Sequence, residues 1–168
     1  EFWDDIVQDN PTFFLGPVIV NIEHIKSQDP YIEVVDGQQR LITATILSAV
    51  IRNVYKSYGK DDLASIIQGN FLSYKDLDNV DKGFRLTTGL STNDFFSQFI
   101  QNSSSNIDES SPSTKEEKRI KNNYITLRKL LSEHISAETS NENKIKKISD
   151  VRDRLNKLTV IEIEIEND

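Results

Sequence analysis

The sequence predicts an α+β protein with a small mixed sheet and a helical second half. Short runs rich in β-branched and aromatic residues occur at 13–20, 31–35 and 159–165. Longer segments repeat apolar residues every three or four positions, which is the period of a helix that packs on one side. Separate strand and helix segments of this kind, with most helical patterns in the second half, predict the α+β class.

Each predicted strand has its own signature. Residues 13–20 predict a buried strand that contains Gly16 and Pro17, a pair that requires a bulge or an edge position because proline cannot donate to a ladder. Residues 31–35 predict a second strand, joined to the first in a hairpin with a long connection. Residues 159–165 alternate Ile with Glu and predict a half-buried strand. Two shorter strands are predicted at 71–74 and 84–87. A charged turn is predicted between them, at 81–83.

The strongest predicted helix covers residues 41–58, where apolar residues recur at three or four and Gly59 closes the pattern. Because its apolar face is broad, we expect this helix to lie at the centre of the fold. Ser91 and Asp94 have the spacing of a capping box ahead of a helix. Trp3 is expected in the core, in a short N-terminal helix. The remaining helices are predicted at 2–7, 61–67, 114–134 and 143–158.

Three segments are expected along the chain. A core covers residues 1–100, a Ser- and Asn-rich loop at 101–113 is expected to be flexible, and a helical extension at 114–168 ends in a strand. The chain opens at Glu1 and contains no Met. We therefore expect a piece of a longer protein whose core is incomplete at the N-terminus.

Composition excludes several functions. The 168 residues include no cysteine, so disulfides, thiolate nucleophiles and cysteine-based zinc sites are ruled out. The net charge of −7 argues against a broad basic surface for nucleic acid, since duplex affinity comes largely from Lys and Arg on phosphates. The apolar runs are too short for a membrane span, and we expect a cytoplasmic protein without a membrane partner.

The most informative stretch follows the second strand. A β-branched run ends in Asp36 and Gly37, then Gln38, Gln39 and Arg40 precede the long helix. The first N–H groups of a helix lack intrahelical partners, and the helix dipole favours an anion there. Arg40 adds a planar, permanently charged guanidinium suited to phosphate oxygens. The turn is therefore a candidate phosphate site. We expect residues 36–39 to form the turn itself and Arg40 to lie in the first helical turn.

Chemistry suggests a role for each residue of this turn. Arg40 is expected to hold a β- or γ-phosphate, and Gly37 to let the backbone approach the ligand closely. Gln38 or Gln39 could orient a water, because an amide both donates and accepts. Asp36 could bind Mg²⁺ through oxygen or serve as the helix cap.

A plainer interpretation stays open for the same residues. In an ordinary strand-to-helix turn, Asp36 is an N-cap and Arg40 a surface ion-pair partner. Thr43 could add a hydroxyl to the site, although a threonine there more often bonds back to its own helical turn.

Three motifs carry a family resemblance: Phe2-Trp3-Asp4-Asp5-Ile6, Phe14-Leu15-Gly16 and Asp36-Gly37-Gln38-Gln39-Arg40-Leu41. In this order they resemble the GmrSD-type N-terminal domain of modification-dependent (type IV) restriction enzymes and related phage-defence proteins. The resemblance implies a ParB/sulfiredoxin-like core, binding of a nucleoside triphosphate (NTP) and Mg²⁺ at the turn, and NTP hydrolysis that regulates a nuclease. The nuclease domain and the modified DNA would then be partners within the full-length protein.

The chain departs from the family pattern at two points. Ile42 stands where the family usually has Thr. The upstream Gln-Arg-Pro-Tyr segment of the family is not in this chain, so we expect the 168 residues alone to bind nucleotide weakly or not at all.

Two other functions remain as alternatives. One is a non-catalytic DNA-binding or protein-interaction module of the same fold, although the negative charge weakens the DNA version. The other is direct nuclease action, for which the sequence offers no convincing cluster, since His24 and His134 lie far apart. The row of Glu162, Glu164 and Glu166 could hold a metal, but alternation along a strand explains it equally well.

Overall fold

The computed structural model describes residues 2–8, 14–27, 30–75 and 81–165, and it has the predicted α+β class. Two compact units divide the chain. The first combines Glu1–Ile42 with Asp153–Asp168, and the second is Thr43–Arg152. Whether the core is of the ParB/sulfiredoxin type stays a prediction, as does the division of the chain at residues 100 and 113.

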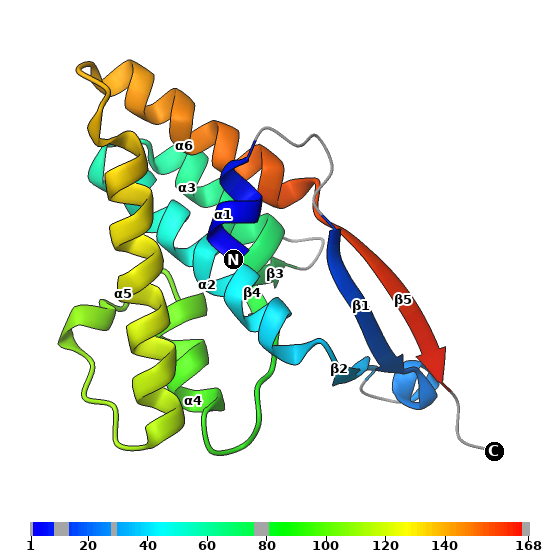
Figure 1. The fold of residues 1–168 in the computed structure, drawn as a ribbon. Coiled ribbons are helices and arrows are strands. Elements are labelled where there is room, and N and C mark those ends of the chain that lie inside the picture. The colour runs from blue at the N-terminus through cyan, green and yellow to red at the C-terminus, as the bar shows by residue number, and fades with distance from the viewer. Residues whose placement is uncertain (1, 9–13, 28–29, 76–80, 166–168) are drawn as a thin grey trace. The chain divides into compact units, whose positions relative to one another are not determined.

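The first unit contains a mixed three-stranded sheet in the order β2-β1-β5 (Figure 1). Its central strand β1 (Phe14–Asn21) pairs antiparallel with β2 (Glu33–Asp36) and parallel with β5 (Thr159–Ile165). The hairpin with a long connection is confirmed, and that connection holds the short 3-10 helix η1 (Glu23–Lys26). The predicted irregularity is confirmed too, because the pairing of β1 with β5 shifts between Phe14 and Gly16.

The sheet differs from the prediction in two respects. Strand β2 begins only at Glu33, and Tyr31 before it stacks on the ring of His24 with centroids 4.3 Å apart. Strand β5 has the predicted bounds, but the predicted half-burial is wrong, since all seven of its residues are exposed. Period-two alternation shows that a strand has an apolar face, and it does not show that another layer covers that face. Residue 13 lies outside the described part of the chain.

The helix α1 (Phe2–Val7) is held within the same unit by an arginine near the end of the chain. Trp3 and Ile6 are buried, as predicted for Trp3. Arg154 donates from Nη1 to the carbonyl oxygens of Ile6 (3.3 Å) and Val7 (2.5 Å). Carbonyls at the end of a helix lack intrahelical donors, so this guanidinium satisfies the last turn of α1.

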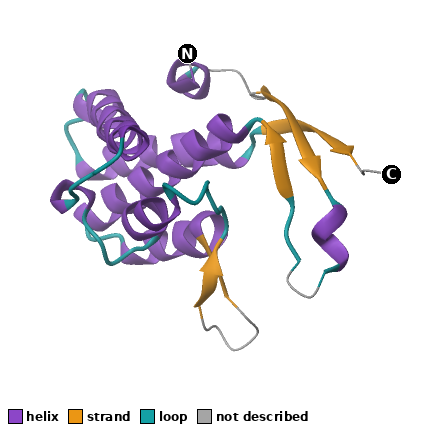
Figure 2. Ribbon diagram, turned by 90° about the horizontal axis from the view of Figure 1, so that it is seen from below, coloured by secondary structure: helices purple, strands orange, loops and turns teal. Residues whose placement is uncertain are grey.

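The second unit is built from helices around the long helix α2 (Gln38–Ser57), most of which lies in it (Figure 2). Ile46, Leu47, Val50 and Ile51 are fully buried, which confirms the predicted central helix. Gly59 has a positive φ of 67°, which any residue with a Cβ adopts only at a cost, and it follows the helix as predicted. The other helical elements are α3 (Asp61–Ile67), η2 (Gln68–Leu72), α4 (Asn93–Phe96), η3 (Ser97–Gln101), η4 (Ile107–Glu109), α5 (Lys115–Ser136) and α6 (Asn141–Asn156).

A second, two-stranded sheet pairs β3 (Ser73–Lys75) with β4 (Asp81–Phe84). The predicted hairpin is confirmed, but its second strand is displaced. Residues 81–83, expected in the turn, form the strand, and residues 85–87, expected in the strand, follow it. Strand signals are weak in so short and charged a stretch, because pairing with a neighbour decides more than intrinsic preference.

The predicted cap at Ser91 is wrong. Helix α4 begins after Thr92, whose hydroxyl donates to Gly89 O at 3.1 Å rather than capping the helix. A complete capping box instead opens α5, where Thr114 and Glu117 bond each other's backbone N–H groups. In the 101–113 segment Ile107 is buried within η4, and the expected flexibility of this segment stays a prediction.

Candidate functional site

The strand-to-helix turn after β2 is made by one residue. Asp36 ends β2, Gln38 begins α2, and only Gly37 lies between them. Gly37 has a φ of 93°, and its carbonyl oxygen accepts from the backbone N–H groups of Arg40 (3.0 Å) and Leu41 (3.2 Å). The expectation that residues 36–39 all form the turn is therefore wrong, because a glycine at positive φ reverses the chain in a single step.

Gly37 also lies tightly against β1. It is buried, and a Cβ built on it would stand 3.1 Å from Val18 Cγ2 and 3.3 Å from the carbonyl oxygen of Pro17. A side chain at this position would meet both the strain of positive φ and a contact with neighbouring backbone. The turn is thus fixed by β1, which makes it a rigid platform for the start of α2.

Arg40 lies in the first turn of α2, as predicted. Its Nη1 donates to the carbonyl oxygen of Pro17 at 2.5 Å, and its Nη2 lies 3.7 Å from Asp36 Oδ2. The guanidinium passes directly over Gly16, where φ is 104° and a Cβ would stand 2.6 Å from Nη1. Gly16 therefore makes room for Arg40, and the side chain remains about one-third exposed (36%).

The two glutamines begin the helix and are exposed. Gln38 Nε2 donates to the carbonyl oxygen of Val34 at 2.6 Å, which ties the start of α2 back to β2. Gln39 lies on the next position of the same helical turn. The structure thus brings Asp36, Gly37, Gln38 and Arg40 together within one unit, where β2 ends and α2 begins, next to β1.

Asp36 forms an ion pair with Arg40, and 59% of its side chain is exposed. Among the described residues no group of three or more His, Cys, Asp or Glu side chains is arranged to hold a metal ion. That finding counts against a metal site in which the described protein side chains alone supply all the ligands. Mg²⁺ at nucleotide sites commonly takes one or two carboxylates and completes its shell with phosphates and water, and Asp36 fits this pattern.

Thr43 belongs to the second unit and is engaged there. Its hydroxyl oxygen accepts from Asn123 Nδ2 of α5 at 3.4 Å, within that unit. The role predicted for Thr43 toward a ligand stays a prediction.

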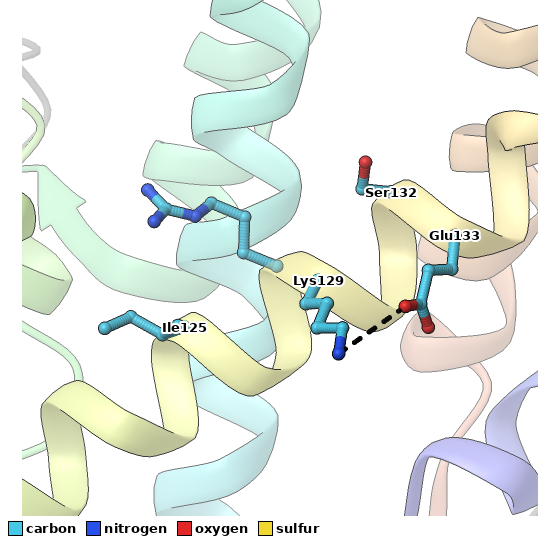
Figure 3. Close-up of a pocket in the computed structure, with 5 residues that line it drawn as sticks. Ile125, Lys129, Ser132 and Glu133 are labelled. Atoms are coloured by element: carbon cyan, nitrogen blue, oxygen red, sulfur yellow. Dashed lines mark ion pairs between the residues drawn. The ribbon is translucent and has the colours of Figure 1, made fainter.

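A surface hollow of about 350 Å³ lies along α5 (Figure 3). It is lined by Ile125, Arg128, Lys129, Ser132 and Glu133. Lys129 pairs with Glu133 at 3.7 Å, and Arg128 holds both carboxylate oxygens of Asp108 at 2.7 and 3.0 Å. Both cations already have carboxylate partners, so the hollow is a weaker candidate site than the turn.

Sequence reasoning missed one buried polar network. Arg52 of α2 is fully buried and donates to Gln68 Oε1 (2.7 Å) and to the carbonyl oxygen of Gln101 (3.1 Å). These partners begin one π-helical turn and end another. Burial lowers the pKa of Arg52 to about 10, so the group stays charged at neutral pH. Its Nη2 has no hydrogen-bond partner in the described part of the chain.

A signal for this network was present in the sequence. Arg52 lies four residues after Ser48 and three before Tyr55, so it shares the face on which both are buried. An arginine on a buried helix face needs acceptors within the core. This network joins α2 to the two π-helical turns and so stabilises the packing of the second unit.

Fold and turn together define an α+β domain that presents an arginine and two amides at the start of a long helix. Comparison with known protein families matches residues 1–168, the whole chain, to the family described as "GmrSD restriction endonuclease, N-terminal domain". The chain belongs to this family, which confirms the resemblance seen in its motifs and places it among restriction and phage-defence proteins. No curated protein matches the chain. Within the described ranges, no helix is both long and apolar enough to cross a membrane.

Proposed function

We propose that this domain binds a nucleoside triphosphate at the turn between β2 and α2, hydrolyses it with Mg²⁺, and thereby regulates a nuclease domain of the full-length protein. Family membership supports the restriction context. The nucleotide step is the proposal, and so is the recognition of modified DNA by the full-length protein.

The observation that carries the proposal is the anchored position of Arg40. A long arginine side chain ordinarily loses much rotamer freedom when it binds a ligand. Here the bond to Pro17 and the space above Gly16 already restrict it. The contact of Arg40 Nη2 with Asp36 at 3.7 Å is longer than a hydrogen bond, so a phosphate oxygen could take its place.

The start of α2 provides the second element of the proposed site. Its first N–H groups carry the positive end of a twenty-residue helix, and they come directly after the rigid Gly37. Asp36 would hold Mg²⁺ together with phosphate oxygens, and Gln38 or Gln39 would orient the attacking water.

The test is Arg40→Ala in the full-length protein, measured as phosphate release from NTP with Mg²⁺. We expect turnover to be lost while the fold is kept, because the bond to Pro17 is partly exposed and contributes only about 0.5–1.5 kcal/mol. Arg119→Ala on the exposed face of α5 is the matched control and should leave turnover unchanged. Equal turnover in Arg40→Ala and wild type would remove Arg40 from the mechanism. Nucleotide binding without turnover in wild type would instead favour a non-catalytic module.

A further inference from the structure

Strand β5 is exposed to a degree that is unusual for a strand of a folded sheet. Four of its seven residues are large and apolar, yet Val160, Ile161, Ile163 and Ile165 are exposed by 40%, 55%, 43% and 37%. Ile161, Ile163 and Ile165 lie on one face of β5 and form a row, here called the isoleucine row. Ile163 stands beside Ile19 of β1 in the parallel register, so the row continues onto β1. Contiguous apolar surface of this kind commonly marks an interaction site.

One edge of the β5 backbone has no paired strand in the part of the chain that the structure describes. Among the described residues β5 pairs with β1 alone, and it lies at the end of the strand order. Ile165 O accepts from Ile22 N at 3.4 Å, so the backbone groups of Ile165 face β1. Backbone groups alternate in direction along a strand, and those of Glu162 and Glu164 therefore face away from β1. Such an edge can template another strand.

The charges on β5 restrict what that strand can be. Glu162 and Glu164 share the face opposite to the isoleucines and are exposed. Antiparallel pairing of two copies about Ile163 would set Glu162 against Glu164 of the second copy, and like charges directly opposite are destabilising. A net charge of −7 adds to the repulsion between copies. Lys or Arg opposite the glutamates would be favourable.

We propose that the outer edge of β5 pairs with an extended segment of a partner protein in which Lys or Arg alternates with apolar residues. The apolar residues extend the isoleucine row, the basic residues lie opposite Glu162 and Glu164, and the backbone ladder supplies the hydrogen bonds. This is strand addition to a sheet edge, in which main-chain bonds give affinity and alternate side chains give specificity.

The test uses labelled synthetic ten-residue peptides and fluorescence anisotropy with the 168-residue chain. An alternating Val-Lys peptide should bind at least tenfold more tightly than an alternating Val-Glu peptide or an alternating Gly-Lys peptide of equal charge. Equal binding of the Val-Lys and Gly-Lys peptides would overturn the proposal, because attraction by charge alone would explain it.

Two variants locate the binding. Glu162→Lys combined with Glu164→Lys should reverse the preference in favour of the Val-Glu peptide. The matched control, Glu133→Lys with Asp150→Lys, makes the same change in net charge at exposed positions of the second unit and should keep the wild-type preference. If the peptide preference reversed in both double variants, or in neither of them, the binding site could not lie on β5.

A proline separates edge pairing from charge when it is compared with Glu164→Gln, which removes the same charge but keeps the backbone N–H and should bind the Val-Lys peptide more tightly than the proline variant does. Glu164→Pro removes an N–H that faces away from β1, so the β1–β5 ladder should survive and far-UV circular dichroism should be unchanged, while Val-Lys binding is lost. Wild-type binding by a folded Glu164→Pro variant would overturn the proposal. Self-association through β5, detected by sedimentation and abolished by the same proline, would overturn it in favour of a second copy.

Discussion

The glycine beneath Arg40 gives the sharpest test of the site's architecture. Gly16→Ala places a Cβ 2.6 Å from Arg40 Nη1 on a backbone with φ of 104°. Strained backbone of this kind costs about 1–3 kcal/mol. The guanidinium must also move, and its bond to Pro17 O contributes about 0.5–1.5 kcal/mol because Arg40 is partly exposed. We expect a total loss of about 1.5–4.5 kcal/mol in the free energy of unfolding.

The two parts of this loss can be separated. Gly59→Ala is the matched control, since Gly59 also has positive φ but no atom lies within 4 Å of its added Cβ. It should show the backbone cost alone, about 1–2 kcal/mol. Adding Arg40→Ala to Gly16→Ala should cost about 1 kcal/mol less than the two single changes predict, because the Pro17 bond can be lost only once.

The assay is urea denaturation followed by the fluorescence of Trp3. Trp3 is the only tryptophan, it is buried, and it belongs to the same unit as Gly16 and Arg40. The reasoning is refuted if Gly16→Ala costs no more than Gly59→Ala and adds fully to Arg40→Ala. Arg40 would then not depend on the space above Gly16, and its anchored position could not support the proposed site.

Three further predictions concern the second unit. Arg52→Ala should lower the free energy of unfolding by about 3 kcal/mol or more, because it leaves a cavity and unpaired acceptors in the core. Arg52→Met refills the volume of the side chain and should cost clearly less. Equal losses for the two variants in urea denaturation would contradict a packing role for Arg52. Thr114→Ala should cost about 1 kcal/mol by removing the cap of α5, whereas Thr114→Ser should be nearly neutral in thermal melts. A side-chain hydrogen bond from Arg128 lowers the pKa of Asp108, so this pair stabilises the fold above the ordinary pKa of Asp, and the contribution is lost as pH falls through the lowered pKa. Asp108→Asn should therefore lower stability at pH 7 by more than it does at pH 2; a loss of equal size at both would contradict this.

Local patterns predicted most of the helices because they depend on nearby residues. The three-to-four spacing predicts the central helix, and its buried residues Ile46, Leu47 and Ile51 lie on the predicted face. The same spacing did not reveal the π-helical turns at Gln68–Leu72 and Ser97–Gln101, since one extra residue in a turn leaves the pattern almost unchanged.

Features set by distant residues could not be predicted. The position of Arg40 in the first helical turn follows from the sequence, but its bond to Pro17 joins the helix α2 to the strand β1, 23 residues earlier in the chain. The exposure of β5 depends on which layers surround the sheet, and a strand of the same sequence could be half-buried in another setting. The roles of Asp36, Gln38 and Gln39 toward a ligand remain predictions.

The parallel pairing of β1 with β5 constrains the order in which the protein can form during synthesis. The two strands come from opposite ends of the sequence, with the whole second unit between them. Helices 43–152 contain their own buried residues and can fold while the ribosome still holds the rest. Strand β1, with Pro17 and Gly16, has to wait for Thr159–Ile165 to emerge before its sheet is complete. The turn that holds Arg40 packs on β1, so a nascent chain would complete the sheet beneath this turn only at the end of translation of this domain.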